Sequence, residues 1–407
     1  MSENNEIKEP SNKNNKVPKL RFKDFFNDWS SCKLSDIAES IKRKNDGKNW
    51  PLMMISASQG FINQSDRYDK DNAGTSKSKY TLIKYGELSY NHGNSKIKKY
   101  GAVFAMNNKG ALIPFVYHTF SIRKPNNPFY FAKYLNLNIH NRYLKKVISS
   151  GARMDGLLNI SLDDFFKMPI NYPSLEEQNK INDFLEKIDT KINLINDKIS
   201  ILKKYKEGIK KYVMKDTIKF WKTGIGNAIE LKNYLFEKNE YGVKNGLYPH
   251  ITLSTEGITD KSERYDRDFL VKNEDKKYKI THLNQLCYNP ANLKFGVICI
   301  NKYGDGIFSP IYSTFDINNI VIDYLELIIT SNDFINYSMK YQQGTVFERM
   351  AVSSDDLCKI KIVTTSFDEQ QRIAKVADTL NKKISKLEDE LLNLKHLKST
   401  LLNSMFI

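Results

Sequence analysis

The sequence predicts two duplicated globular domains of mixed α/β (α+β) type that alternate with two long α-helices. Three observations support this fold class. The chain has 407 residues, too many for one small domain, and its hydrophobic fraction of 40% is sufficient to build real cores. Segments of the first half recur in the second half at an offset near 192 residues. In both copies, apolar residues then follow the spacing of a coiled coil.

The first element in chain order is a polar, asparagine-rich tail over residues 1–16, where we expect disorder. The tail lacks the apolar core of a signal peptide, and the chain contains no apolar run long enough to span a membrane. The four cysteines lie far apart and form no CxxC pair, so neither a disulfide framework nor a zinc site of standard spacing is expected. These features predict a cytoplasmic protein without a membrane partner.

Residues 17–173 form the first predicted globular domain, and they carry most of the net charge of +16. The block contains 25 basic and 12 acidic side chains, and within it residues 72–154 contain 14 basic side chains and one acid, Glu87. Because like charges repel, a surface of one sign is typical of a protein that binds a polyanion. Nucleic acid is the first candidate and an anionic membrane surface the second. A general excess of lysine in this chain is the alternative explanation.

Residues 174–215 and 366–407 are predicted to form the two long helices. Each opens with Ser-x-x-Glu, starting at Ser174 and Ser366, which is a capping box whose Ser and Glu side chains bind free N–H groups of the first turn. Apolar residues then recur in alternating steps of four and three, so we expect the two helices to pack against each other. The predicted seam contains Ile181, Leu185, Ile188, Ile192, Ile195, Ile199 and Leu202 in the first helix, and Ile373, Leu380, Ile384, Leu387, Leu391 and Leu394 in the second.

The second globular domain, predicted over residues 216–365, repeats features of the first. Tyr90-Asn91 matches Tyr288-Asn289, and the Ser-x-Asp-Asp segment at residues 161–164 matches residues 353–356. Short β-like runs separated by Gly, Asn, Ser and Lys predict mixed α/β structure in both domains. An acid-free stretch with five lysines also recurs, at residues 276–304. The local charge pattern is therefore duplicated although the net charge is not.

The residues that an enzyme acting on nucleic acid would need are missing. No phosphate-binding G-x-x-x-x-G-K-[ST] loop is present, and Gly304-Asp305-Gly306 predicts a turn. Asn289-Pro290 lacks the second proline and the aromatic residue with which amino-methyltransferases hold a flipped base. The pairs Asp163-Asp164 and Asp355-Asp356 are explained by charge complementation at a helix N-terminus. The chain is therefore predicted to be non-catalytic, with no metal and no cofactor of its own.

Several sequence segments, taken in order, resemble one protein family. The segments are residues 17–22 (VPKLRF), Trp29, residues 33–37 (KLSDI), and Gly151-x-Arg153 followed by residues 158–161 (LNIS). The two long segments that open with Ser-x-x-Glu-Gln complete the pattern. In this order the segments resemble the specificity (S) subunits of type I restriction–modification systems. The resemblance covers about residues 17–407, which is the whole chain after the N-terminal tail.

The resemblance implies that each globular half is a target-recognition domain that recognises one half of an asymmetric bipartite DNA site. The two helices would form an antiparallel coiled-coil spacer in a pseudo-two-fold molecule. Two methyltransferase (M) subunits would supply S-adenosylmethionine and adenine methylation, and two restriction/translocase (R) subunits would bring ATP and Mg. This chain would bind double-stranded DNA and position those subunits in host defence. The alternative from another class is a non-enzymatic coiled-coil scaffold that binds protein or RNA.

The DNA-contacting residues are expected in equivalent acid-free loops of the two halves, because Lys and Arg neutralise phosphate while Asn and Arg pair with base edges. The first choices are Lys96, Lys98, Lys99 and Tyr100 in the first half, with Asn292, Lys294 and Phe295 in the second. The second choices are Lys77, Lys79, Arg67, Arg264 and Arg267. For each of these residues, an ordinary solvated surface position is the alternative.

Overall fold

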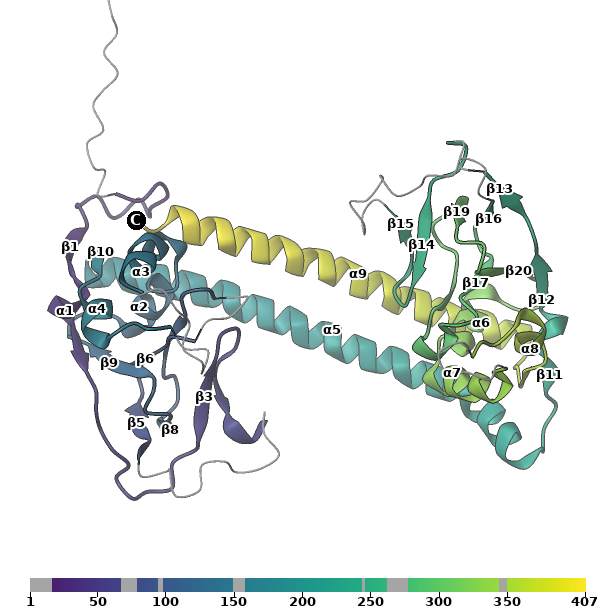
Figure 1. Ribbon diagram of the computed structural model, residues 1–407, viewed down its shortest axis with the longest axis horizontal. Coiled ribbons are helices and arrows are strands. Elements are labelled where there is room, and N and C mark those ends of the chain that lie inside the picture. The colour runs from purple at the N-terminus through teal and green to yellow at the C-terminus, as the bar shows by residue number, and fades with distance from the viewer. Residues whose placement is uncertain are drawn as a thin grey trace, which may run out of the picture. The chain divides into compact units, whose positions relative to one another are not determined.

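The computed structural model describes residues 17–66, 79–93, 98–148, 158–243, 246–261, 277–343 and 350–407. The chain folds as two compact units (Figure 1). The first unit contains the N-terminal globular half, the beginning of one long helix and the end of the other. The second unit contains the C-terminal globular half and the remainder of both helices. The boundaries between the units therefore lie inside the two long helices, after residues 194 and 390. The predicted domain boundaries at residues 173, 215 and 365 were placed at the expected ends of the helices, so the two divisions are not directly comparable.

A four-stranded antiparallel sheet with the order β2-β9-β6-β7 forms the centre of the first half. Its strands are β2 (Ala38–Ser40), β6 (Leu88–Asn91), β7 (Ala102–Ala105) and β9 (His118–Ile122). Three further strand pairs are β1 (Ser30–Lys33) with β10 (Pro169–Tyr172), β3 (Met53–Ser56) with β4 (Gly60–Asn63), and β5 (Thr81–Lys84) with β8 (Gly110–Ile113). The short helices are α1 (Leu34–Ile37), α2 (Pro128–Tyr134), α3 (Asn141–Val147) and α4 (Leu162–Phe166), with 3-10 turns η1 (Gln64–Asp66) and η3 (Asn138–His140).

The second half has a central antiparallel sheet with the order β12-β20-β17-β18. Its strands are β12 (Leu235–Lys238), β17 (Leu286–Tyr288), β18 (Ile298–Ile300) and β20 (Ser313–Ile317). Around it lie β11 (Ile229–Glu230) with β21 (Lys361–Ile362), β14 (Ile251–Ser254) with β15 (Gly257–Asp260), and the sheet β13 (Tyr241–Gly242), β16 (Tyr278–Thr281) and β19 (Gly306–Phe308). The short helices are α6 (Ile322–Ile329), α7 (Asn332–Ser338) and α8 (Ser354–Cys358), with 3-10 turns η4 (Leu231–Asn233), η6 (Leu293–Phe295) and η7 (Met339–Tyr341).

The two halves share one topology, which confirms the predicted duplication. The central sheets match strand for strand, and each half adds a hairpin and a short helix capped by Ser161 or Ser353. In both helices the Ser hydroxyl accepts a hydrogen bond from the backbone N–H of the second Asp, Asp164 or Asp356. The acidic pairs therefore begin short helices, as their position before the long helices suggested.

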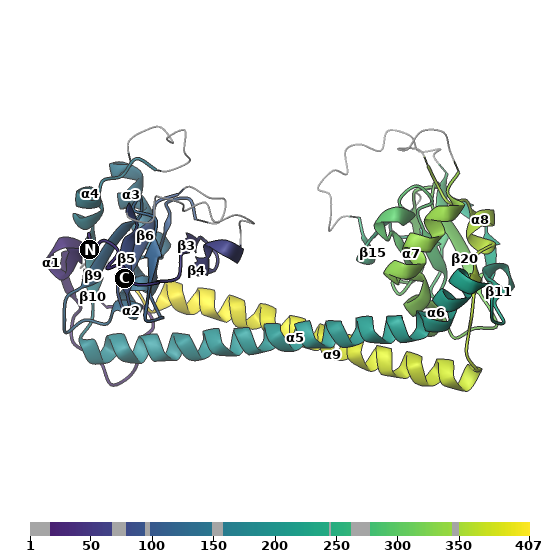
Figure 2. The same cartoon turned by 90° about the horizontal axis from the view of Figure 1, so that it is seen from below.

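The long helices are α5 (Leu175–Thr223) and α9 (Phe367–Ser404), and they pack together (Figure 2). In the first unit, the beginning of α5 packs with the end of α9, through residues such as Ile181, Leu185 and Leu401. In the second unit, the end of α5 packs with the beginning of α9, through Met214 and Ala377 among others. The two helices are therefore antiparallel.

The predicted seam residues are all withdrawn from solvent to some degree. Those that are buried are Ile181, Leu185, Ile188, Ile195, Ile199, Ile373, Ile384 and Leu391. Those that are half-buried are Ile192, Leu202, Leu380, Leu387 and Leu394. One ion pair between the helices lies in each unit, Lys398 with Asp189 and Lys203 with Glu388. Ion pairs that remain accessible to solvent contribute little to the free energy of folding.

Two details of the helices differ from the prediction. The helix expected to end at residue 215 continues to Thr223, and its additional turns pack on the second half, where Thr217 is buried and the Trp221 ring N–H donates to the Lys361 carbonyl at 2.7 Å. The capping box is only half formed at the start of α5, where the backbone N–H of Glu177 donates to the Ser174 hydroxyl at 3.4 Å. The Glu177 carboxylate accepts hydrogen bonds from the Arg21 guanidinium instead, at 2.8 and 2.7 Å.

Candidate nucleic-acid interface

The strand order of each half brings several loops to one end of the central sheet. In the first half, Tyr90 at the end of β6 pairs with His118 at the start of β9, so the β6–β7 loop and the β8–β9 turn emerge together. In the second half, Tyr288 and Ser313 pair in the same way. We call this end the loop end. It contains residues 79–80, 92–101 and 114–117 in the first half, and residues 277, 289–297 and 309–312 in the second, as far as the structure describes them.

His92 joins three segments at the loop end of the first half. Its Nδ1 lies 2.9 Å from the carbonyl oxygen of Leu158, and its Nε2 lies 2.9 Å from that of Val116. The backbone N–H of Leu158 also donates to the His92 carbonyl. The His92 ring stacks on His118 with 4.6 Å between centroids, and burial lowers the pKa of His118. The sequence prediction missed His92, because only the fold brings residues 92, 116 and 158 together.

Each loop end contains the same Lys-aromatic-Gly sequence. Lys99 and Tyr100 precede Gly101 in the first half, and Lys294 and Phe295 precede Gly296 in the second. Both glycines have a positive φ, +80° and +79°. A Cβ on Gly101 would also lie 2.5 Å from the Asn91 carbonyl oxygen, so only glycine fits this close approach.

The lysine of each sequence lies over its aromatic neighbour. The Nζ of Lys99 is 5.8 Å from the centre of the Tyr100 ring, and that of Lys294 is 5.2 Å from the Phe295 ring. The Tyr100 carbonyl accepts a hydrogen bond from the Tyr90 hydroxyl at 2.7 Å, which ties the loop to the sheet. Phe295 is 64% exposed. Two loops of different length therefore present a cation and a ring at equivalent positions.

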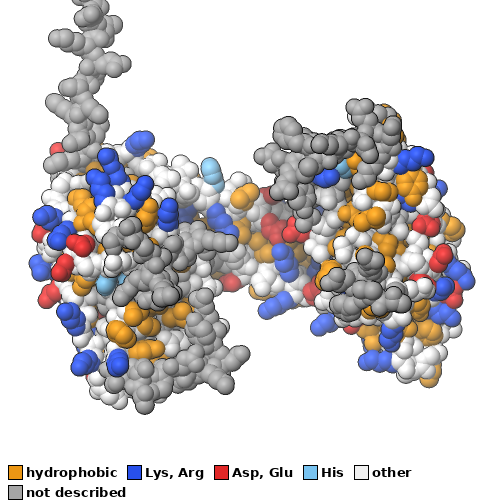
Figure 3. All heavy atoms as spheres, viewed as in Figure 1, with side chains coloured by type: hydrophobic (Ala, Val, Ile, Leu, Met, Phe, Trp, Pro, Cys, Tyr) orange, Lys and Arg blue, Asp and Glu red, His pale blue; other side chains and the backbone are white. Residues whose placement is uncertain are grey.

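Strand pairing adds one more lysine to each loop end, and this added lysine is exposed in both halves. Thr81 at the start of β5 pairs with Ile113 at the end of β8, so Lys79 lies beside the β8–β9 turn. In the second half, β16 pairs with β19 in the same manner, and Lys277 precedes β16. On the face drawn in Figure 3, Lys and Arg side chains are more frequent than Asp and Glu over the first half.

The single acid of the basic stretch lies at the opposite end of the sheet. Glu87 is in the β5–β6 turn, where its carboxylate forms a two-pronged ion pair with Arg43 at 2.9 and 3.0 Å. It also accepts a hydrogen bond from the backbone N–H of Lys84. Glu87 therefore does not neutralise the lysines of the loop end.

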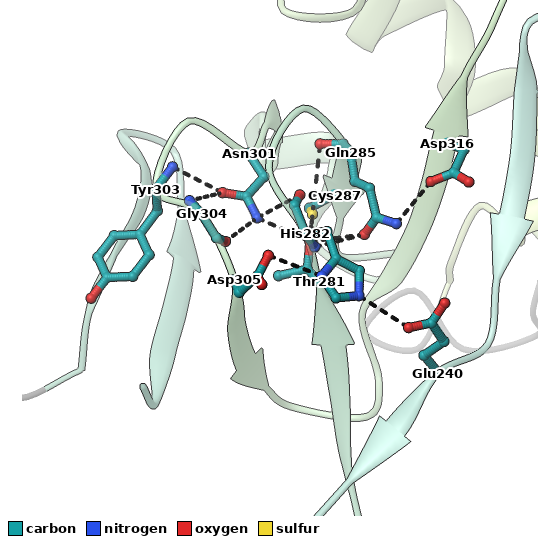
Figure 4. Close-up of polar contacts among 10 residues, drawn as sticks. All are labelled: Glu240, Thr281, His282, Gln285, Cys287, Asn301, Tyr303, Gly304, Asp305 and Asp316. Atoms are coloured by element: carbon teal, nitrogen blue, oxygen red, sulfur yellow. Dashed lines mark hydrogen bonds and ion pairs between the residues drawn. The ribbon is translucent and has the colours of Figure 1, made fainter. Parts of the chain in front are cut away.

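The corresponding opposite end of the second half is closed by a polar network (Figure 4). The fully buried Asn301 donates to the Thr281 hydroxyl and to the carbonyls of His282 and Gly304. His282 lies between Asp305 and Glu240, at 2.9 and 3.0 Å, and these hydrogen bonds raise its pKa above the usual 6.5. The network joins the ends of β16 and β18 to the start of β19, and the residues named in it do not belong to the loop end.

Some of the predicted DNA-contacting residues lie at or beside the loop ends, and the others lie outside the described residues. Lys99, Asn292 and Phe295 are exposed at the loop ends, Tyr100 and Lys294 are half-buried there, and Lys79 is exposed beside them. Lys98 is half-buried at the loop end of the first half, where its ammonium group donates to the Asn136 carbonyl at 3.1 Å and burial lowers its pKa. The predicted residues that lie outside the described residues are Lys96, Lys77, Arg67, Arg264 and Arg267.

No group of three or more His, Cys, Asp or Glu side chains in the described part of the chain is arranged to hold a metal ion. Among the same residues, no helix combines the length and the apolar character that a membrane span requires. The fold and the two loop ends define a class of protein, a duplicated protein whose two similar domains are joined to two packed helices.

Comparison with known proteins narrows this class. Residues 27–204 match the family model of the type I restriction modification DNA specificity domain. The chain is 25% identical over 390 residues to a Methanocaldococcus jannaschii protein described as the specificity subunit of the type I restriction enzyme MjaX, covering 86% of this chain and 85% of that protein. It is similar in fold to the S subunit of a type I system from M. genitalium, with a TM-score of 0.61, 15% identity, and coverage of 96% and 99% of the two chains.

Residues 27–204 are therefore similar to the type I restriction modification DNA specificity domain, and the chain is similar over most of its length to specificity (S) subunits, in sequence to one and in fold to another.

Proposed function

We propose that each globular half recognises one half of an asymmetric bipartite DNA site through its loop end. The observation that carries this proposal is the duplicated arrangement of Lys99-Tyr100-Gly101 and Lys294-Phe295-Gly296 at equivalent sheet ends. Lysines contribute phosphate neutralisation, and exposed aromatic rings offer contact to bases. Because the two halves differ in sequence around this shared frame, they select different half-sites.

In this proposal, the antiparallel helices α5 and α9 act as the spacer that fixes the distance between the two half-sites. A dimer-like protein with two recognition surfaces reads half-sites at a separation that its own geometry sets. The ion pairs Lys398–Asp189 and Lys203–Glu388 support this role, because they favour one register of the helices.

The helices are also the proposed docking surface for the methyltransferase subunits. In the second unit, a groove of about 640 Å³ between α5 and α9 is lined by exposed apolar side chains, among them Ile201, Tyr205, Tyr212 and Val376. An exposed apolar groove on a helix pair fits an amphipathic helix of a partner. Two M subunits supply S-adenosylmethionine and adenine methylation, and two R subunits supply ATP- and Mg-dependent restriction. The complex works in the cytoplasm in host defence.

The test is methylome sequencing of a host that expresses this chain with its neighbouring methyltransferase subunit, compared with a host that lacks only this chain. We expect a new bipartite motif, methylated on adenine in both half-sites, that depends on this chain. If the complex assembles and no chain-dependent motif appears, the proposal is wrong and a scaffold function gains weight.

A further inference from the structure

The β8–β9 turn and its equivalent between β19 and β20 have an unusual composition. In the first, the backbone N–H of Tyr117 donates to the Pro114 carbonyl at 3.2 Å, and in the second that of Tyr312 donates to the Ser309 carbonyl at 3.2 Å. The central positions of such turns normally hold Gly, Pro, Asn, Asp or Ser. Here Phe115 and Val116 in the first half and Ile311 in the second are not among these residues, and only Pro310 is.

Both turns expose a large apolar side chain while the rest of the turn is held firmly. Phe115 and Ile311 are each 62% exposed. In the first half, the Val116 carbonyl faces the His92 ring and the following Tyr117 packs against a buried cluster that includes Met53 and Ile83. In the second half, the ring of Tyr312 packs on Phe308 with 4.9 Å between centroids. The exposed side chains therefore contribute little to the cores, and their occurrence in both halves calls for another explanation.

The turns lie at the loop ends, and each lies beside an exposed lysine. Lys79 is adjacent to the turn of the first half through the pairing of Thr81 with Ile113. Lys277 has the same relation to the turn of the second half, because Lys279 pairs with Phe308. Both lysines are exposed. An apolar side chain flanked by cations matches the chemistry of a DNA groove, in which charged phosphates border the faces and methyl groups of the bases.

We infer that Phe115 and Ile311 are specificity-determining residues that press an apolar side chain against the bases, one in each half-site. The inference rests on the proposed function and adds to it which residues contact bases. Apolar side chains distinguish bases through the thymine methyl group, and they wedge between base steps that unstack easily. Neither contact releases counterions, so its contribution to affinity does not depend on salt, unlike that of a lysine on phosphate.

The experiment uses the complex of this chain with its methyltransferase subunits and a fluorescent duplex that contains the methylated motif. Affinity is measured as a function of salt concentration for the wild type, Phe115→Ala, Ile311→Ala and Lys99→Ala. We expect each apolar variant to lose on the order of tenfold in affinity with an unchanged salt slope. Lys99→Ala should lower the slope by about one.

Methylome sequencing of the same variants assigns each residue to a half-site. Phe115→Ala should relax base preference in one half of the motif only, and Ile311→Ala in the other half only. Matched controls are Phe26→Ala and Ile225→Ala, which remove apolar side chains that are 81% and 69% exposed in the segments before β1 and β11. These controls should leave both affinity and motif unchanged.

Three results would overturn the inference. If wild-type complex binds its motif and both apolar variants bind and methylate it equally well, the two residues do not contact bases. If the variants lose methyltransferase subunits in light scattering while DNA binding by assembled complex is normal, the turns bind protein instead. If the wild-type complex has no preferred motif, the proposed function itself fails, and the inference fails with it.

Discussion

Arg21 and Glu177 join the N-terminal segment to the beginning of α5 by a bidentate ion pair. The Glu177 side chain is only 1% exposed, and the hydrogen bonds that Arg21 donates to the Glu177 carboxylate raise the pKa of Arg21. A buried carboxylate is stable only while its partner remains, because it has given up its hydration. The pair therefore replaces the second half of the predicted capping box and anchors the segment that precedes β1.

Replacement of Arg21 should show this dependence. We expect Arg21→Met to lower the free energy of unfolding of the first half by about 3 kcal/mol, because the Glu177 carboxylate is left without a partner. Urea unfolding of the full chain, followed by hydrogen exchange to separate the two halves, measures the change. Lys382→Ala is the control, since its ion pair with Asp378 lies exposed on α9 and should have a much smaller effect on the free energy of unfolding. Equal effects of the two substitutions would contradict the argument.

His282 makes the stability of the second half depend on pH. Its hydrogen bonds to Glu240 and Asp305 raise its pKa above 6.5, so the protonated ring is favoured in the folded state. The stabilisation is fully present below the unfolded pKa of 6.5 and is lost as the pH rises through the higher folded pKa. We expect His282→Gln to lower the urea midpoint of the second half more at about pH 5.5 than at about pH 8.5.

The control for this substitution is His396→Gln, because His396 is exposed on α9. Its effect on the urea midpoint should be small and the same at both pH values. A pH-independent effect of His282→Gln would show that the ring acts only through its neutral hydrogen bonds.

At the scale of elements, the C-terminal end of α9 completes the first half. Phe406 is 5% exposed and lies 5.4 Å from the Tyr130 ring and 6.5 Å from that of Trp29, centre to centre. Met405 and Phe406 match Val213 and Met214 at the repeat offset of 192, and that pair is buried in the second half. Each globular half is therefore completed by the far end of a helix that begins in the other half of the sequence.

This arrangement predicts an effect at one end of the chain on elements near the other. Phe406→Ala should destabilise the first half by about 3–5 kcal/mol, because it opens a cavity among buried aromatic rings. Hydrogen exchange should then show faster exchange in β6, β7 and α2 and unchanged exchange in α6 and β17. Leu392→Ala is the control, as this α9 side chain is 67% exposed. Equal loss of protection in both halves would contradict a local role for Phe406.

At the scale of the whole molecule, each of the two units contains the same central sheet and the same loop end, together with parts of both α5 and α9. Ile192→Asp combined with Ile384→Asp places carboxylates at a half-buried and a buried helix position. Because burial of an unpaired charge is costly, the helices should separate or shift while each half stays folded. We expect footprinting of the complex to show altered half-site spacing. Unchanged protection of the wild-type bipartite site would contradict the spacer role.

Much of the fold followed from local sequence patterns. The offset of 192 residues, the alternating steps of four and three, and the Ser-x-x-Glu openings predicted two long packed helices between duplicated domains, and the structure confirms this arrangement. Such patterns are visible in the sequence because a helix repeats its environment every few residues. The eight extra residues at the end of α5 were missed, because the residues that bury them, around Ile360 and Ile362, are far away in the sequence.

The sequence by itself determined that one stretch, residues 72–154, is nearly free of acidic side chains, and that acid-free segments rich in lysine occur in both halves. Only the tertiary structure decided which of those lysines share a surface. Strand pairing placed Lys79 beside the turn with Phe115, moved Glu87 to the opposite end of the sheet, and turned Lys98 towards the Asn136 carbonyl. The physical reason is that sheet register and loop closure join residues distant in sequence, and no local pattern encodes those long-range pairings.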